Sequence, residues 1–288
     1  MRLTGRSLAG LAAVLLIITW AVSAGAQEAQ QSDPAKWSRE QKTQFLLTAK
    51  IISQKGTSDG ITGSMRATLE NEMGKHDAHI QTIDEYKARF DTPLGTQINF
   101  KDTYKFNIAA YILDRILNLG LIPVTVERKV GGKTAAVTWW IDDVLMNERD
   151  RLKDKVTPPA PEKWNEAMYV VRVFDQLIAN TDRNLGNIVI TKDWDLWMID
   201  HTRAFRTYHD LLEAKNLVKC DRALLQGLRD LNKPVLKEKM GKYLTGLEID
   251  GVLARRDKIV KFFDGRVAAE GENAVLYDYL VERRKLTP

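Results

Sequence analysis

Apolar and polar residues alternate in two pairs of short segments in the first half of the chain. The first pair is formed by residues 65–69 and 76–84, and the second by residues 122–128 and 134–142. Successive side chains of a strand point to opposite faces, so this period of two predicts four strands. Gly131 and Gly132 separate the second pair and suit a tight turn. We therefore predict two β-hairpins.

Apolar residues at helical spacing mark two further segments. Ser38 and Gln41 fit a capping box at the start of the first helix. The apolar positions that follow it are Phe45, Leu46, Ala49 and Ile52. Asp102 is a candidate cap for a second helix, which we expect to run to Leu119 because Gly120 suits the position after a helix end. Residues 54–64 are rich in Gly, Ser and Thr and are expected to form a loop.

The second half of the chain reads differently. Three prolines within residues 152–163 end any regular element there. Residues 164–178 then have a helical pattern, and short apolar strands at 188–190 and 196–199 flank a polar turn. Helices follow to the C-terminus. A strand-rich half before a helix-rich half predicts an α+β fold of two lobes with a cleft between them.

The N-terminus has the order of a secretory signal peptide. Arg2 and Arg6 precede the apolar residues 8–22, and Ala24 and Ala26 supply small residues for cleavage. A membrane anchor is the alternative, but the apolar run is short for a spanning helix. We expect residues 1–26 to be removed and 27–37 to be a flexible lead-in. The mature protein would then be periplasmic or extracellular, without a stable membrane span.

The cysteine content excludes an internal disulfide, and the charge pattern argues against a nucleic-acid partner. One cysteine among 288 residues rules out an internal disulfide. The formal net charge of +5 is mild, and no dense Lys/Arg block with interleaved aromatic residues occurs, so no nucleic-acid partner is expected.

Three oxygen-bearing side chains surround the small hairpin of the second half. Asn187 and Asp200 flank its two strands, and Asp182 lies a little upstream. An antiparallel hairpin brings such flanking positions together, with Cβ atoms ~5 Å apart. Their oxygens suit one Mg²⁺ ion, and Asp182 is placed to act as a base or to orient a hydroxyl nucleophile. The alternative is a plain turn, because Asp and Asn are common turn residues.

The segment "NTDRNLGN…MIDHTRAF" resembles the atypical kinases of the phosphatidylinositol 3-/4-kinase-like group. The resemblance is to the secretory-pathway Golgi casein kinases and the bacterial persistence-toxin kinases. It is strongest over residues 174–205 and extends weakly to 104–128. It implies a two-lobed protein-kinase-like fold, with an N-lobe at 38–142 and a C-lobe at 143–288. ATP and Mg²⁺ would bind between the lobes.

The resemblance also assigns roles to individual residues. Asp182 would be the catalytic aspartate, and Asn187 and Asp200 the metal ligands. Gly60 and Gly63 would lie in the loop that covers the phosphates, and Trp139 and Trp140 beside the adenine. The activity it implies is transfer of the ATP γ-phosphoryl group to a hydroxyl on a protein, lipid or small molecule.

The sequence departs from these kinases at two positions. Gln81 stands where they carry a phosphate-binding lysine, and Asn107 where they carry its glutamate partner. Arg66 or Lys87 could supply the missing cation. Three alternatives remain open: a nucleotide-binding pseudokinase or interaction protein, a nucleotidyl transferase on the same scaffold, and a different alignment of this lobe.

The signal-peptide pattern makes the first testable prediction. The protein recovered after export should begin at Gln27, because cleavage after Ala26 follows the small residues. Intact-mass measurement checks this, and an exported protein that retains Met1 would contradict it.

Overall fold

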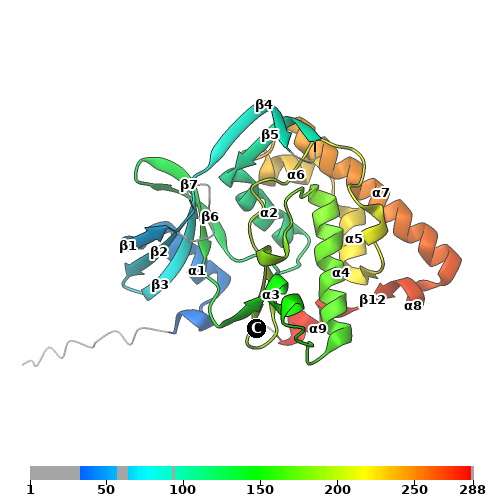
Figure 1. The fold of residues 1–288 in the computed structure, drawn as a ribbon, viewed down its shortest axis with the longest axis horizontal. Helices are drawn as coiled ribbons and strands as arrows, with labels where there is room; N and C mark the ends of the chain where they lie inside the picture. Colours follow the sequence, from blue (N-terminus) through cyan, green and yellow to red (C-terminus); the bar gives the residue numbers. More distant parts are fainter. Residues whose placement is uncertain (1–32, 57–63, 93–94, 287–288) are drawn as a thin grey trace, which may run out of the picture. The chain divides into compact units, whose positions relative to one another are not determined.

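The computed structural model describes residues 33–56, 64–92 and 95–286. All of them belong to one compact unit, Ser32–Pro288. The predicted signal peptide, most of the lead-in, and Gly60 and Gly63 lie outside the described residues. Strands dominate the first half of this unit and helices the second (Figure 1), as the α+β prediction requires.

An antiparallel five-stranded sheet forms the first half, with the order β1-β2-β3-β7-β6. Its strands are β1 (Lys50–Gly56), β2 (Ser64–Asn71), β3 (Gly74–Gln81), β6 (Thr125–Val130) and β7 (Lys133–Trp139). The hairpins β2–β3 and β6–β7 confirm the two predicted from alternation. Gly131 and Gly132 both have positive φ in the β6–β7 turn, which explains why glycine stands there.

The two faces of this sheet have different surroundings. Helix α1 (Arg39–Thr48) covers one face, where Phe45 packs in a buried cluster with Ala78, Ile80 and Trp139. Side chains alternate along β3, so His79 and its odd-numbered neighbours point to the other face. This second face carries the polar side chains that matter for the candidate site.

The predicted end of the first helix is wrong. The capping box of Ser38 and Gln41 is present, but α1 ends at Thr48, and Ile52 lies in β1 instead of on the helix. Residues 54–56 also belong to β1, which shortens the predicted loop. The extended backbone of Ala49 stops the helix and begins the strand.

Helix α2 (Tyr104–Ile116) is capped by Thr103 instead of Asp102. The Thr103 side chain accepts the Lys105 N–H, whereas Asp102 pairs with Arg203. The helix also ends three residues before Leu119, because Asn118 already has the left-handed conformation.

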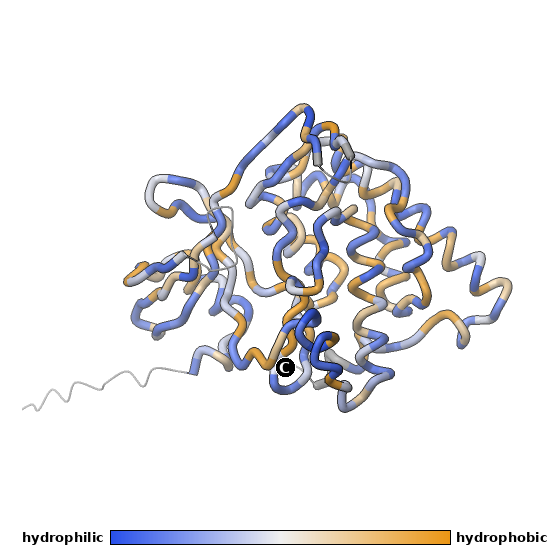
Figure 2. The backbone as a smooth tube through the Cα atoms, viewed as in Figure 1, coloured by the Kyte–Doolittle hydropathy of each residue, from blue (hydrophilic) through white to orange (hydrophobic). Residues whose placement is uncertain are grey.

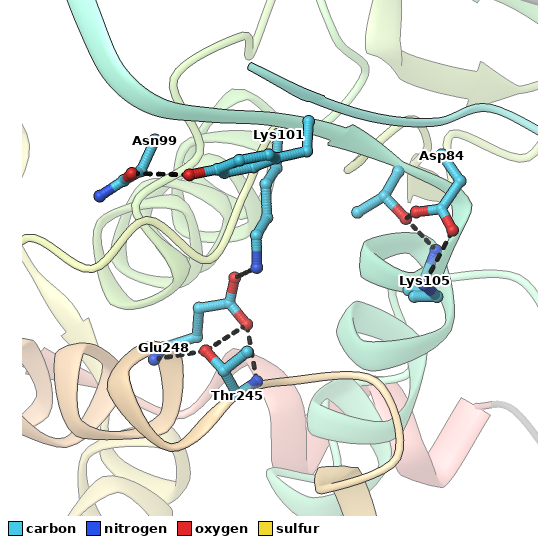
Figure 3. A network of polar contacts seen from close by, with 8 residues as sticks. Asp84, Asn99, Lys101, Lys105, Thr245 and Glu248 are labelled. Carbon is cyan, nitrogen blue, oxygen red and sulfur yellow. Dashed lines mark hydrogen bonds and ion pairs between the residues drawn. The ribbon is translucent and has the colours of Figure 1, made fainter. Parts of the chain in front are cut away.

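A hairpin that the sequence pattern did not predict precedes α2. It consists of β4 (Asp84–Thr92) and β5 (Gly95–Thr103). Figure 2 shows β4 as mostly hydrophilic. This strand therefore lacks the alternation of apolar and polar residues that identified the other strands. Lys101 of β5 reaches Glu248 of helix α7 (Gly246–Glu270) at 2.5 Å, and Figure 3 shows the two side chains pointing toward one another.

The second half contains a small sheet and most of the helices. The sheet has the order β10-β9-β8, with β8 (Val144–Asn147), β9 (Ile188–Thr191) and β10 (Leu196–Met198). The other helices and strands are α3 (Glu148–Lys153), α4 (Pro161–Ile178), α5 (Arg222–Asp230), α6 (Lys233–Met240), α8 (Glu272–Val275), α9 (Tyr279–Leu286), β11 (Cys220–Asp221) and β12 (Leu276–Tyr277). Short 3₁₀ turns are η1 (Pro34–Lys36), η2 (Leu185–Asn187) and η3 (Ala214–Asn216).

Helix α4 is the centre of the largest apolar core, into which Phe174 and Leu177 are fully buried. Arg255 of α7 is also fully buried and donates hydrogen bonds to the carbonyl oxygens of Leu177, Arg206 and Tyr208. It therefore fixes the end of α4 relative to the segment that follows the β9–β10 hairpin. Over the described ranges, no helix combines the length and apolar character that crossing a membrane requires.

The contacts of Glu248 predict that this residue contributes to the stability of the fold. It completes the capping box of α7 with Thr245, pairs with Lys101, and is 2% exposed. Glu248→Ala should lower the free energy of unfolding by about 2–4 kcal/mol, since a cap and a buried charged hydrogen bond are both lost. Urea unfolding followed by circular dichroism measures this. The control is Glu238→Ala on exposed α6 surface, and equal stability of the two variants would contradict the assignment.

Candidate active site

The β9–β10 hairpin brings Asn187 and Asp200 to the same end, as predicted. Ile188 pairs with Met198, and one residue further out the Ile199 N–H donates to the Asn187 carbonyl at 3.0 Å. The hydrogen bonding between the two strands therefore continues to Ile199, the last residue before Asp200. Asn187 closes the short turn η2, and Asp200 directly follows the paired residue.

Arg183 ties this hairpin end to helix α4. Its guanidinium makes a forked interaction with the Asp175 carboxylate of α4, with an Nε–Oδ2 distance of 2.9 Å. It also donates to the carbonyl oxygens of Asn187 at 3.2 Å and of Ile199 at 2.8 Å. The planar fork of arginine suits such simultaneous contacts. One side chain thus holds both strand ends of the hairpin.

Arg183 also fixes the protonation of His201, the residue after Asp200. Arg183 donates to His201 Nε2 at 2.9 Å, so that ring nitrogen must be unprotonated. Burial, with a smaller contribution from the Arg183 charge, holds the pKa of His201 well below its ordinary value. His201 is therefore neutral and structural.

Asp182 is oriented by the same network. Asn180 donates to Asp175 at 3.1 Å and accepts the Asp182 N–H at 3.2 Å, so the loop after α4 is braced at its start. The Asp182 carboxylate is half exposed and lies 3.2 Å from Arg203 Nη1. Arg203 also contacts the buried Asp102 at 2.8 Å. Asp182 is thus accessible but fixed in place.

Two carboxylates and two guanidinium groups act on the Asp182 carboxyl. Burial is the largest cause that raises the pKa of the Asp182 carboxyl, the charges of Asp200 and Asp102 raise it further, and Arg203 opposes them. These influences show that Asp182, Asp200 and Asp102 lie in one electrostatic cluster around Arg203. A carboxylate of raised pKa is a better proton acceptor than an ordinary aspartate.

Asp200 has a φ of 54°, which is uncommon for a non-glycine residue and is tolerated best by Asn and Asp. Its Oδ1 accepts from the Thr202 hydroxyl at 3.1 Å. Burial lowers the pKa of the His79 imidazole of β3, and the negative charge of Asp200 opposes this, so Asp200 lies toward the sheet face that carries His79. His79 in turn hydrogen-bonds Ser64, the first residue of β2.

The side-chain amide of Asn187 has no hydrogen-bond partner among the described residues, and its Nδ2 is buried. Amide oxygen and nitrogen positions are interchangeable, and a buried amide without a partner is costly. Together with the Asp200 carboxylate, this amide offers the oxygen donors that a hard divalent cation prefers. The residues present fit such an ion. Clusters of three or more His, Cys, Asp or Glu suited to a metal are absent from the described residues.

Gln81 and Asn107 occupy the predicted elements, at the end of β3 and in the first turn of α2. They form separate hydrogen bonds. Gln81 accepts the Thr82 N–H at 3.1 Å, and Asn107 accepts the His201 N–H at 2.7 Å. Asn107 therefore supports the residue after Asp200. A direct hydrogen bond between the two amides is not found in the described part of the chain.

The remaining predicted nucleotide-binding residues lie on two sides of the sheet. Arg66 pairs with Asp77 at 2.6 Å and lies over the Trp140 ring at 4.2 Å, on the face that also carries His79. Trp139 is buried against Trp37 and Phe45 on the face covered by α1. The structure brings Arg66 and Trp140 together and places the Trp139 ring apart from them.

The alternative cation, Lys87, lies on the β4–β5 hairpin. It is paired with the exposed Glu85 at 3.4 Å and lies over the rings of Phe90 and Phe100. Of the two substitutes for the missing lysine, Arg66 is the one on the sheet face that carries His79.

No protein-family model matches the chain, and neither does any curated protein. Solved structures do match. The structure of hydra Fam20 with sugar has a TM-score of 0.63 and 13% identity, covering 83% of this chain and 92% of that chain. The Golgi casein kinase matches with a TM-score of 0.59 and 16% identity, covering 83% of this chain and 79% of that one. The same coverage, with a TM-score of 0.60 and 15% identity, is found for the Golgi casein kinase with Mn/ADP bound.

This chain has the Fam20 kinase fold. At these identities the likeness concerns the fold, and it confirms the two-lobed kinase-like architecture that the sequence predicted. Within this Fam20-like fold, sequence reasoning missed Asp175, Arg183 and the Arg203–Asp102 pair. Arg183 stands next to Asp182, so its position was a usable signal. Asp102 gave none, because its partner Arg203 is 101 residues further along the chain. Asp175 is only eight residues before Arg183, but it lies in a helix and Arg183 in the loop after it, so no regular spacing pairs them.

The Arg183 network makes the next prediction. Asp175→Ala leaves the Arg183 guanidinium without its carboxylate partner, with both side chains only 11% exposed. The free energy of unfolding should fall by about 3–5 kcal/mol, as for a broken buried ion pair. Thermal unfolding measures the loss. The matched control is Asp193→Ala in the exposed turn of the same hairpin, which should change stability little, and a similarly stable Asp175→Ala would contradict this role.

Proposed function

We propose that the protein is a kinase-like phosphotransferase that moves the γ-phosphoryl group of ATP to a hydroxyl acceptor. The observation that carries the proposal is the joint placement of Asp182, Asn187 and Asp200 at one end of the β9–β10 hairpin. The Fam20 kinase fold supports it. The Golgi casein kinase, a neighbour in fold, was solved with Mn/ADP bound.

Each of these three side chains has a separate task. Asp200 and Asn187 would hold a divalent cation, for which Mg²⁺ is our choice, together with the nucleotide phosphates. When bound, that cation supplies positive charge to the transferring phosphoryl group. Asp182 orients the acceptor hydroxyl and accepts its proton, for which its half-exposed carboxylate of raised pKa is suited. Arg203 holds Asp182 in position.

Binding of the phosphates must work without the usual lysine, because Gln81 is neutral. Arg66, on the sheet face that carries His79, is our choice of substitute, but it is already paired with Asp77. The site therefore relies more on the divalent cation than a kinase with the lysine–glutamate pair would. This neutral replacement is also what favours the second candidate, a nucleotide-binding pseudokinase. The third candidate, nucleotidyl transfer, would need ATP to bind in the reverse direction.

We further propose that the protein acts outside the cytoplasm, on an acceptor that is a protein, a lipid or a small molecule. The signal-peptide pattern of residues 1–26 supports export.

Two variants separate the metal site from the catalytic base. Asp200→Asn suits the left-handed backbone yet removes the metal-binding charge, so the Mg²⁺-dependent thermal stabilisation by ATP should be lost. At a ligand concentration of a hundred times Kd, that stabilisation amounts to ~2.7 kcal/mol, which is easily measured. Asp182→Asn is the matched control: it should retain the stabilisation while turnover falls ~10²-fold or more.

Thermal unfolding with ATP, with and without Mg²⁺, gives the binding result independently of any acceptor. Unchanged stabilisation in Asp200→Asn would exclude Asp200 as a ligand. Full turnover in Asp182→Asn would exclude Asp182 as the base.

A further inference from the structure

The segment that joins the two halves of the chain is held by a charged contact on each side. It covers residues 140–143, between β7 and β8. Asp142 contacts His76 of β3 at 2.7 Å, and Asp143 pairs with Lys192 of the β9–β10 turn at 2.9 Å. Both members of the Lys192 pair are exposed, whereas the His76 side chain is only 7% exposed. Exposed ion pairs contribute little, so the contact with His76 is the stronger restraint of the two.

Both ring nitrogens of His76 face hydrogen-bond acceptors. Nε2 lies 2.7 Å from the Asp142 carboxylate, and Nδ1 lies 2.7 Å from the backbone carbonyl oxygen of Asp77. A carbonyl oxygen only accepts hydrogen bonds, and an ionised carboxylate does the same. Neutral imidazole has one N–H and can satisfy one of these two contacts, whereas the imidazolium ion has two and satisfies both.

The ring that stacks on His76 also favours its charged form. The Trp139 indole lies nearly parallel to the imidazole, with 3.7 Å between the ring centroids and an interplanar angle of 11°. The face of an indole attracts a cation that lies on it. Trp139 is itself packed against Trp37 and Phe45, so the surface that carries the imidazole is fixed in place.

Lys42 of α1 is a second cation near Asp142. Its Nζ lies 5.1 Å from the centroid of the Trp139 ring. Burial lowers the pKa of Lys42, and the charge of Asp142 opposes this. No ion pair within 4.0 Å joins Lys42 to Asp142 in the described part of the chain, whereas His76 is in contact with this carboxylate. Lys42 opposes a positive charge on His76, but Asp142 lies closer to His76 than to Lys42.

Two further charged pairs lie on the neighbouring strand and turn. The Asp77 carboxylate pairs with Arg66 of β2 at 2.6 Å. In η1, the exposed Lys36 pairs with Asp33 at 3.9 Å. Each pair has no net charge, so neither takes the place of His76 as the partner of the connecting segment.

We propose that His76 forms a pH-dependent link to the segment that joins the two halves, and that this link is closed in the imidazolium form. When the pH rises and the ring loses one proton to solvent, its remaining N–H serves only one of the two acceptors, and the other contact brings two lone pairs together. The segment then loses its contact with β3 at Asp142, while its pair with Lys192 remains. The stability that the link contributes is therefore present at acidic pH and lost as the pH rises. The proposal does not depend on the phosphotransferase activity.

Replacing Asp142 by asparagine tests the proposal without removing the hydrogen bond. In Asp142→Asn the side-chain amide can donate to Nε2 while Nδ1–H donates to the Asp77 carbonyl, so a neutral imidazole satisfies both contacts. The melting temperature of the wild type, measured relative to that of Asp142→Asn, should therefore fall by about 3 °C or more from pH 6 to pH 8.5.

The matched control is Asp143→Asn, which removes the same charge from the next residue. Its partner Lys192 stays protonated over this range, so the difference from the wild type should not change with pH. Asparagine also tolerates the positive φ of Asp143. A difference for Asp142→Asn that is equally independent of pH would overturn the proposal.

Nitrogen-15 NMR of the histidine rings measures the protons themselves. The chain has four histidines, and His76→Phe, which keeps a flat ring on Trp139, identifies the signals of His76. At pH 7 both ring nitrogens of His76 should be protonated to a greater extent than those of the exposed His209, and Asp142→Asn should remove this excess. A His76 ring with a single protonated nitrogen at pH 7, or an excess that persists in Asp142→Asn, would contradict the proposed link.

Discussion

The Arg183 guanidinium is the interaction on which the candidate site depends. It joins the Asp175 carboxylate of α4 to the carbonyl oxygens of Asn187 and Ile199 and to the ring of His201. Those contacts set the end of the β9–β10 hairpin, and therefore the positions of Asn187 and Asp200. Asp175 belongs to α4, and α4 packs in the largest apolar core of the described residues. The packing of α4 therefore determines the positions of the site residues.

A second charged group completes the arrangement. Arg203 lies between the carboxylates of Asp182 and Asp102, with Asp200 close enough to affect the pKa of Asp182. Asp182, Asp200 and Asp102 carry three negative charges, and Arg203 and Arg206 carry two positive ones. The remaining net negative charge favours a divalent cation. The neutral Gln81 and Asn107 fit this picture, since Asn107 serves to hold the His201 backbone rather than to balance a lysine.

Many of the strands and the main candidate site residues could be predicted from local sequence pattern. Alternation identified β2, β3, β6 and β7, and the spacing of Asp182, Asn187 and Asp200 identified the hairpin end. Local pattern failed where long-range contacts decide. Asp102 looks like a helix cap but is needed by Arg203, 101 residues further on, so Thr103 caps α2 instead. The hydrophilic β4–β5 hairpin is held by contacts such as Lys101 to Glu248, which no local periodicity reveals. Alternation places the successive residues Trp139 and Trp140 on opposite faces of the sheet. Local pattern does not show which of these faces α1 covers, because that depends on tertiary packing.

The central claim is that this cluster transfers a phosphoryl group. Its most direct test is to incubate the protein with Mg²⁺ and ATP labelled at either the γ- or the α-phosphate, with a mixture of exported proteins as acceptor. The account predicts that γ-label becomes covalently attached to an acceptor and that α-label does not. Attachment of α-label would show nucleotidyl transfer instead, and attachment of neither label by a protein that still binds ATP would contradict the claim of catalysis.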